Sequence, residues 1–177
     1  MIPFDLADVR KILVRTPDVI ARQLTDLPEP WWRNSEGGET WSPFDVVGHL
    51  IHGERADWIE RARIIIEEPG RTFDPFDRFA QFEESRGETP SDLLTEFRTL
   101  RDENIATFDA LPLAEHLDRT GTHPDLGTVT LRQHLATWAV SDLTHIAQIS
   151  RVLLRQYAGE VGPWAKYFSL LSGWRPR

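Results

Sequence analysis

The sequence predicts an all-α protein, an antiparallel four-helix bundle with a short C-terminal helix, folded as a single domain over residues 1–177. Apolar residues recur at spacings of three and four along several long segments, which is the period of one helix face. No segment of four or more residues alternates between apolar and polar, so no strand is expected. Proline and glycine separate the helical segments, and the length matches one domain.

The N-terminal region is expected to be helical from residue 4 to residue 27, where Pro28 and Pro30 end the pattern. Thr16 and Pro17 look like an N-cap followed by a proline at the first helical position. The pattern leaves open whether this region is one kinked helix or two pieces. Residues 28–41 are expected to form a loop.

The next helix begins after Ser42, a good N-cap, with Pro43 at the first helical position and Asp45 in the first turn. It is expected to continue to about Glu68, just before Pro69 and Gly70 end it. The apolar face of this helix is formed by Phe44, Val47, Ile51, Trp58, Ala62 and Ile65.

Two further long helices begin at threonine caps. Thr89 and Pro90 start a helix that ends near Leu111, and Thr130 caps a helix over about residues 131–157. The stripe of the last long helix is formed by Leu131, Leu135, Trp138, Asp142, His145, Ile149 and Val152. We expect these helices to complete the bundle.

The connections differ in character. Residues 69–88 carry a phenylalanine at every third position from Phe73 to Phe82, and form either a short helix over the bundle or a loop held by these rings. Residues 112–129 are expected to be a turn-rich connection. A short C-terminal helix presents an apolar face that either packs on the bundle or forms a homodimer interface. This face contains Trp164, Phe168, Leu171 and Trp174.

Composition excludes several classes of partner. The net charge is −8 and basic residues do not cluster, which argues against nucleic acid and against an anionic membrane. No segment is apolar enough to span a membrane, and the N-terminus lacks a secretory signal. Cysteine is absent, which excludes disulfides and thiolate metal sites and favours a cytoplasmic location.

Six histidines are the main candidates for metal ligands and acid–base groups near neutral pH. His49 lies off the apolar stripe, on a side of small and polar residues with Gly53 and Asp57, and Gly48 precedes it. Two glycines inside a helix cost roughly 1 kcal/mol each, which indicates either a close helix contact or open space for a ligand. His52 lies at the edge of this side and is expected to be solvated, unless that edge faces the same cavity.

His145 lies on the apolar stripe of the last long helix, three residues after Asp142. Either these side chains form a structural hydrogen-bond network, or His145 is a metal ligand oriented by a nearby carboxylate. His134 is about 16 Å from His145 along the helix and cannot share a metal ion with it. The sequence contains no glycine-rich phosphate loop, nucleophile elbow, His-Glu-x-x-His or Glu-x-x-His motif, so no catalytic residue is assigned.

Three segments together resemble the DinB-like superfamily, which takes its name from a damage-inducible bacterial protein. They are Trp41-Ser-Pro-Phe-Asp-Val-Val-Gly-His49-Leu, His123-Pro-Asp-Leu-Gly-Thr-Val-Thr-Leu and Asp142-Leu-Thr-His145-Ile-Ala-Gln148-Ile. The resemblance covers about residues 41–157. It implies a four-helix bundle, often a dimer, that carries zinc or nickel on three side chains at one end of the bundle.

By this resemblance, His49 and His145 are metal ligands, and the remaining ligand position, four residues before His145, is occupied by Ser141. Serine is a poor ligand for zinc or nickel, whose protein sites use histidine, cysteine and carboxylate. Either another donor completes the site, or the site is lost and the fold is kept. The candidate donors are His52, Asp142, Glu54 and water.

Two functional hypotheses follow from the resemblance. The first is a metal-dependent enzyme, of the thiol-dependent transferase or hydrolase class, in which the ion activates a low-molecular-weight thiol or water against a small-molecule substrate. The second is a non-catalytic binding or structural bundle with a vestigial metal site.

Overall fold

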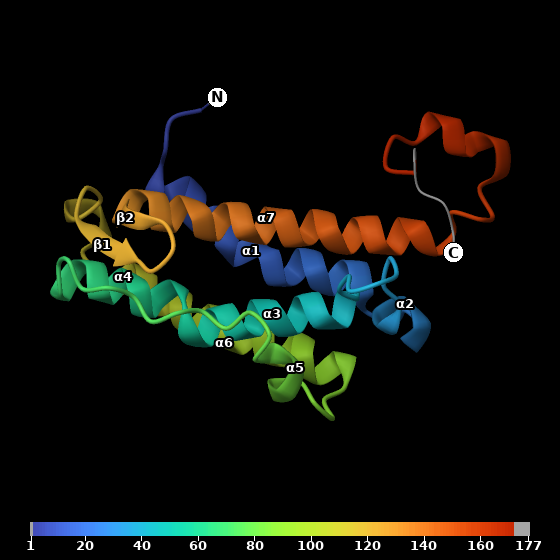
Figure 1. Ribbon diagram of the computed structural model, residues 1–177, viewed down its shortest axis with the longest axis horizontal. Coiled ribbons are helices and arrows are strands. Elements are labelled where there is room, and N and C mark those ends of the chain that lie inside the picture. Colours follow the sequence, from blue (N-terminus) through green and yellow to red (C-terminus); the bar gives the residue numbers. More distant parts are fainter. Residues whose placement is uncertain (1, 172–177) are drawn as a thin grey trace.

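The structure is a computed structural model and describes residues 2–171 of the chain. Its long helices are α1 (Leu6–Leu24), α3 (Pro43–Ala56) continued by α4 (Trp58–Glu67), α6 (Pro90–Ala110) and α7 (Leu131–Gln156). They pack side by side as a four-helix bundle (Figure 1), so the predicted fold class is confirmed. No helix among residues 2–171 has both the length and the apolar character needed to cross a membrane.

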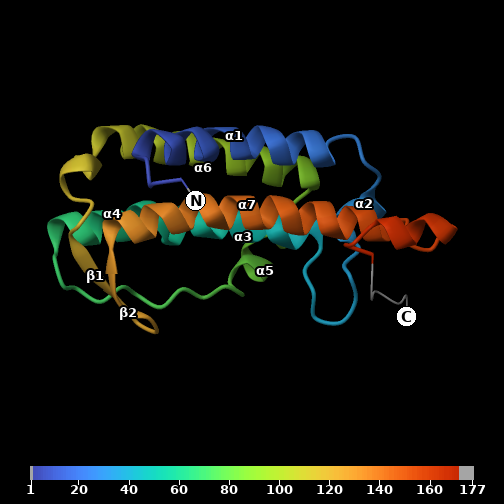
Figure 2. The ribbon, with the colours of Figure 1, turned by 90° about the horizontal axis from the view of Figure 1, so that it is seen from above.

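The order of the helices in the bundle differs from a simple up-and-down arrangement. Helices α1 and α7 run in one direction, whereas α3, α4 and α6 run in the other (Figures 1 and 2). Helix α1 contacts α6 and α7, and α3 contacts α6 and α7. Two neighbouring pairs are therefore parallel, namely α1 with α7 and α3 with α6. The parallel α3–α6 pair requires residues 68–89 to return along the outside of the bundle, as Figure 2 shows; we call this segment the crossover.

Three of the four predicted N-caps are present, and each forms a reciprocal capping box. Ser42 Oγ accepts from the main-chain N–H of Asp45 at 3.2 Å, while Asp45 accepts from the N–H of Ser42 at 2.9 Å. Thr89 and Thr130 begin α6 and α7 in the same way. These caps satisfy N–H groups that a helix start leaves free, and they fix where the long helices begin.

The N-terminal region is one helix, and the predicted internal cap is wrong. Asp5, not Thr16, caps α1, and Thr16 Oγ1 instead donates to the carbonyl oxygen of Ile12 at 3.1 Å. Pro17 lies inside α1 and cannot donate to the carbonyl of Leu13. That carbonyl accepts from Arg101 Nη1 at 2.7 Å, so the helix continues through the proline.

Three other predicted segments need correction. The loop 28–41 contains a short helix, α2 (Glu29–Arg33). The helix expected over residues 43–68 is interrupted at Asp57, whose backbone angles of −121° and −71° are not helical. The connection after α6 contains a short 3₁₀ helix (Leu113–Glu115) and a hairpin, β1 (Thr120–His123) with β2 (Gly127–Thr130), whose four-residue strands are too short to show an alternating pattern.

The crossover and the C-terminal segment lie against the bundle to different extents. The crossover contains α5 (Gln81–Glu84) and is held at its other end by the hairpin, because Phe73 N–H donates to Thr122 O at 2.9 Å. The C-terminal segment forms a 3₁₀ helix (Gly162–Tyr167) that leaves Trp164 and Phe168 exposed. Leu171 is buried, whereas the predicted contact of Trp174 lies outside the described residues.

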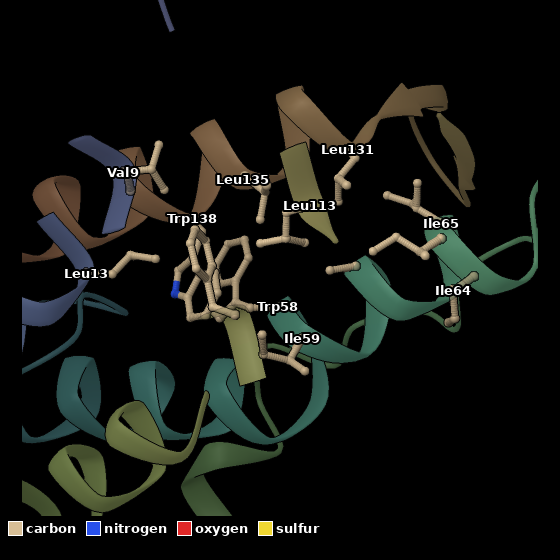
Figure 3. Close-up of a cluster of buried hydrophobic side chains, with 14 of the residues drawn as sticks. Val9, Leu13, Trp58, Ile59, Ile64, Ile65, Leu113, Leu131, Leu135 and Trp138 are labelled. Atoms are coloured by element: carbon tan, nitrogen blue, oxygen red, sulfur yellow. The ribbon is translucent and has the colours of Figure 1, made fainter. Parts of the chain in front are cut away.

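The core has two apolar clusters. One lies toward the hairpin and includes the stacked rings of Trp58 and Trp138, whose centroids are 5.7 Å apart (Figure 3). The other lies toward α2 and includes Ile20, Ile51 and Phe97. Each long helix, with α3 and α4 taken together, contributes one end to the first cluster and the other end to the second. The two clusters therefore meet in the middle of the bundle.

A buried polar layer lies where the two clusters meet. The Arg101 guanidinium is fully buried and donates to Asp142 at 2.6 and 3.0 Å and to Glu54 at 2.7 Å. Asn104 and Trp138 donate to the remaining acceptor positions of Glu54. Burial lowers the pKa of Arg101, but the charges of Glu54 and Asp142 outweigh it, so the pKa is raised overall. The guanidinium therefore stays charged and joins α3, α6 and α7.

Candidate metal and ligand site

The structure places His49 of α3 and His145 of α7 beside each other. Their ring centroids are 4.9 Å apart and the rings meet edge to face at 64°. The antiparallel α3–α7 contact brings together two histidines that are distant in sequence. Because both rings are held by long helices rather than by loops, their separation is set by the packing of the bundle.

His49 lies in an aromatic environment, which its position on the helix did not indicate. Trp41 lies on one side of the ring, with centroids 4.8 Å apart, and Phe76 of the crossover lies on another side at 5.7 Å. The helical pattern could not predict this, because Phe76 belongs to a segment without regular structure. The crossover therefore forms one wall of the site.

The two glycines near His49 allow close packing. A Cβ atom at Gly48 would lie 2.5 Å from Ser85 Oγ and 2.7 Å from Gln81 Oε1, so α5 could not approach α3 as closely. At Gly53 a Cβ atom would lie 3.1 Å from the indole nitrogen of Trp58. Of the two interpretations of these glycines, close approach of another segment is confirmed at Gly48.

Both imidazoles are neutral at neutral pH. Burial lowers the pKa of His49 to about 4, with smaller contributions from His145, His52 and Arg78. Burial also lowers the pKa of His145, partly offset by its hydrogen bond with Gln148. Neutral imidazole nitrogens carry the lone pairs that metal ions and hydrogen-bond donors require.

The ring nitrogens have distinct partners. Nδ1 of His145 lies 3.0 Å from Gln148 Oε1, and the neutral ring donates its proton there because a carbonyl oxygen can only accept. Nε2 of His145 is then the acceptor. Nδ1 of His49 is buried and has no hydrogen-bond partner among the described residues. A buried nitrogen without a partner is costly unless a ligand, an ion or water supplies one.

Among the residues that the structure describes, no third protein ligand accompanies this pair. Ser141 lies on α7, one turn before His145, and lines the same cavity as His49. His52 is buried rather than solvated, and its Nδ1 pairs with Glu84 Oε1 at 3.0 Å. Within residues 2–171, no group of three or more histidines and carboxylates is arranged to bind a metal ion.

Arginines hold the carboxylates that could have replaced the missing ligand. Glu54 and Asp142 are both paired with Arg101, so neither is available, and the predicted network of Asp142 with His145 is absent. Asp57, next to Gly53 in the cavity wall, lies 2.8 Å from Nε of Arg61. The suggestion that Glu54 or Asp142 supplies the missing metal ligand is therefore wrong.

Two cavities meet at His49. The outer cavity has a volume of about 800 Å³, and its wall includes Trp41, His145 and Gln148. The inner cavity has a volume of about 270 Å³, and its wall includes Trp58, Phe76 and Ser141. This space is large enough for a small molecule beside the two imidazoles.

Two residues that line this space were not among the site residues predicted from the sequence, although helix spacing places Asp57 on the same side as His49. Arg78 lies in the crossover, in a polar stretch that favours no particular structure, and lines both cavities. Asp57 is at the break between α3 and α4 and lines the inner cavity. The other histidine on α7, His134, is remote from the site, and its Nε2 pairs with the carbonyl oxygen of Trp58 at 2.8 Å.

Comparisons with known proteins agree with the fold. The family model described as the DinB superfamily matches residues 12–149. The solved structure of YfiT from Bacillus subtilis, described as a probable metal-dependent hydrolase with an unusual four-helix bundle topology, is similar with a TM-score of 0.75. The similarity covers 88% of this chain and 93% of that chain at 21% sequence identity. The search of curated proteins gave no match.

Proposed function

The chain belongs to the DinB superfamily, and on this basis we propose that it is a metal-dependent enzyme whose divalent ion is held by His49 and His145. The observation that carries the proposal is the contact of two neutral imidazoles at the junction of two cavities. The description of YfiT as a probable metal-dependent hydrolase supports the same class of activity. The two cavities beside the histidines are of a size that suits a small-molecule substrate.

The two histidines fit a shared zinc or nickel ion. Two imidazoles bound to one tetrahedral ion, with nitrogens about 2.0–2.1 Å from it, place their ring centres about 5 Å apart. The observed separation is 4.9 Å. Gln148 fixes the His145 ring from its other nitrogen, as carbonyl and carboxylate groups do for metal-bound histidines.

The residues around the pair prepare the space for a substrate. When bound, the ion would lower the pKa of a coordinated water or low-molecular-weight thiol and so supply a nucleophile. Trp41 and Phe76 pack against the His49 ring and form apolar walls beside it. Because Ser141 is a poor ligand, water or a donor atom of the substrate must fill the third position, and we expect weak binding of the ion.

A second candidate function is a non-catalytic binding protein with a vestigial metal site. It is favoured by the pairing of Glu54 and Asp142 with Arg101, which leaves neither of these two carboxylates to replace the missing ligand. In this case the cavities would bind a small molecule directly, with the buried Nδ1 of His49 as one of its hydrogen-bond partners.

Calorimetric titration of tag-free protein with zinc and with nickel separates the two candidates. We expect the unaltered protein to bind an ion and His145→Ala to lose that binding. His116→Ala is the matched control, since His116 lies outside both cavities and its removal should leave the affinity unchanged. Equal affinity of His145→Ala and the unaltered protein would contradict the proposed ligand pair.

A further inference from the structure

We infer that the natural ligand is a small molecule with a flat apolar part and an oxyanion, carboxylate or phosphate, and that Arg78 binds the oxyanion. The inference rests on the proposed function in one respect, because it takes the cavities at His49 as the ligand site. It does not require a metal ion. Its basis is the position and the pairing of charges around the two cavities.

Arg78 stands where the cavities meet. The residues common to the walls of the inner and outer cavities are His49 and Arg78. A ligand that reaches from one cavity into the other must therefore pass the guanidinium and the imidazole. Since His49 is neutral, Arg78 provides the positive charge at this junction.

Arg78 has no carboxylate partner among the described residues. Its guanidinium lies 4.7 Å from the centroid of the Phe79 ring, and no ion pair engages it. The other arginine in these walls, Arg151, is engaged, since its Nε lies 2.7 Å from Glu36. Arg78 is thus available for a carboxylate or phosphate, which a guanidinium can bind through two parallel hydrogen bonds.

Most acidic groups in the walls are already satisfied. Asp57 pairs with Arg61, and Glu36 lies between Arg151 and Arg155 at 2.7 and 2.8 Å. Asp45 accepts the N–H and O–H groups of Ser42 in the capping box. Glu39 is the remaining carboxylate of the outer wall. The carboxylate of the inner wall, Asp57, is the one paired with Arg61.

The inner cavity favours an apolar group. Leu50, Trp58 and Phe76 are part of its wall, and its volume is about 270 Å³. A cavity of roughly 150 Å³ suffices for benzene, so one aromatic ring or a similar flat group fits. A ligand with its ring in this cavity would bring an attached oxyanion to Arg78 at the mouth.

The test uses metal-free, tag-free protein and four probes of similar shape: benzoate, phenyl phosphate, neutral benzamide and cationic benzylamine. Binding is followed by NMR through the indole N–H signals of Trp41 and Trp58, which line the outer and the inner cavity. We expect one or both anions to bind about tenfold more tightly than benzamide, the ratio that a charge-assisted hydrogen bond supplies. The better anion identifies the carboxylate or the phosphate as the natural group.

Variants locate the preference. Arg78→Gln should bring the anions to the affinity of benzamide, and Arg78→Lys should retain part of the preference. Arg86→Gln is the matched control, because Arg86 is an exposed arginine of the same crossover that pairs with Glu83 and does not line either cavity. It should bind as the unaltered protein does.

Several results would overturn the inference. Equal binding of anions and benzamide, tighter binding of benzylamine, an anion preference that survives Arg78→Gln, or no binding of any probe would each do so. Zinc titration of the same samples keeps the two proposals apart. Anion preference without metal binding would contradict only the metal-dependent function, and metal binding without anion preference would contradict only the role of Arg78.

Discussion

Arg101 Nη1 donates to the main-chain oxygen of Leu13, the carbonyl that Pro17 leaves without its helical partner. The same guanidinium binds Glu54 and Asp142, so one side chain of α6 is in contact with α1, α3 and α7. This polar layer separates the two apolar clusters of the core. It also engages Glu54 and Asp142, which lie on the helices that carry His49 and His145, and so limits how the metal site can be completed.

Replacement of Arg101 by methionine is expected to be strongly destabilising. Arg101→Met replaces the guanidinium by a flexible apolar side chain and leaves the carboxylates of Glu54 and Asp142 buried without a cation. The loss of one partner from a buried ion pair costs about 3–5 kcal/mol. Urea denaturation measures the free energy of unfolding.

The control for this prediction is Arg98→Met. Arg98 lies on α6, as Arg101 does, and forms a partly exposed ion pair with Asp18 of α1. We expect a loss below about 1 kcal/mol there, because solvent screens exposed ion pairs. Similar losses for the two variants would show that the polar layer contributes no more than a surface contact.

Gly48→Ala is expected to loosen the crossover. Alanine is favoured over glycine inside a helix by about 1 kcal/mol, but here the new Cβ would lie 2.5 Å from Ser85 Oγ. We therefore expect lower thermal stability and faster protease cleavage between residues 69 and 89. Ser85→Ala in the same chain should recover part of the loss, and a stability gain for Gly48→Ala alone would contradict the close approach of α5.

Stability is expected to fall as the pH drops from about 6.5 to about 4, partly through His49. The pKa of His49 is about 4 in the folded protein, compared with the ordinary value of 6.5, so the unfolded chain binds more protons in this interval. One such group contributes at most about 1.4 kcal/mol per pH unit.

His49→Gln tests this contribution, because glutamine is polar and does not titrate. After chelator treatment of both proteins, the free energy of unfolding of the variant should depend less steeply on pH than that of the unaltered protein. Some dependence should remain, since burial also lowers the pKa values of His134 and His145, while the raised pKa of Asp57 acts in the opposite sense. An unchanged slope would mean that the His49 ring is accessible to solvent.

Local signals in the sequence were sufficient for the long helices. Ser42, Thr89 and Thr130 were predicted as caps because serine and threonine favour this position, and Pro43 and Pro90 follow two of them. In the structure each forms a capping box. The break at Asp57 was missed because neither glycine nor proline marks it. Pro17 was misinterpreted as a helix start because its acceptance inside α1 depends on Arg101, which lies on another helix.

The candidate site was predictable in part. The pairing of His49 with His145 was expected from the resemblance to the DinB-like superfamily. Helix spacing alone showed only on which face of its own helix each histidine lies. One of the two interpretations of Asp142 paired it with the nearby His145, because the sequence shows neighbours on one helix and not Arg101 across the bundle. The walls formed by Phe76 and Arg78 could not be expected, since the path of the crossover is set by tertiary contacts.

The most direct test of the metal-dependent function is elemental analysis of tag-free protein, supplied with zinc or nickel, beside Ser141→His. Histidine at position 141 would restore a third ligand on α7 one turn before His145. Our account predicts that the unaltered protein retains some metal and that the variant approaches about one ion per chain. Metal in the variant but none in the unaltered protein would contradict the account, and would leave a ligand-binding bundle whose metal site has been lost.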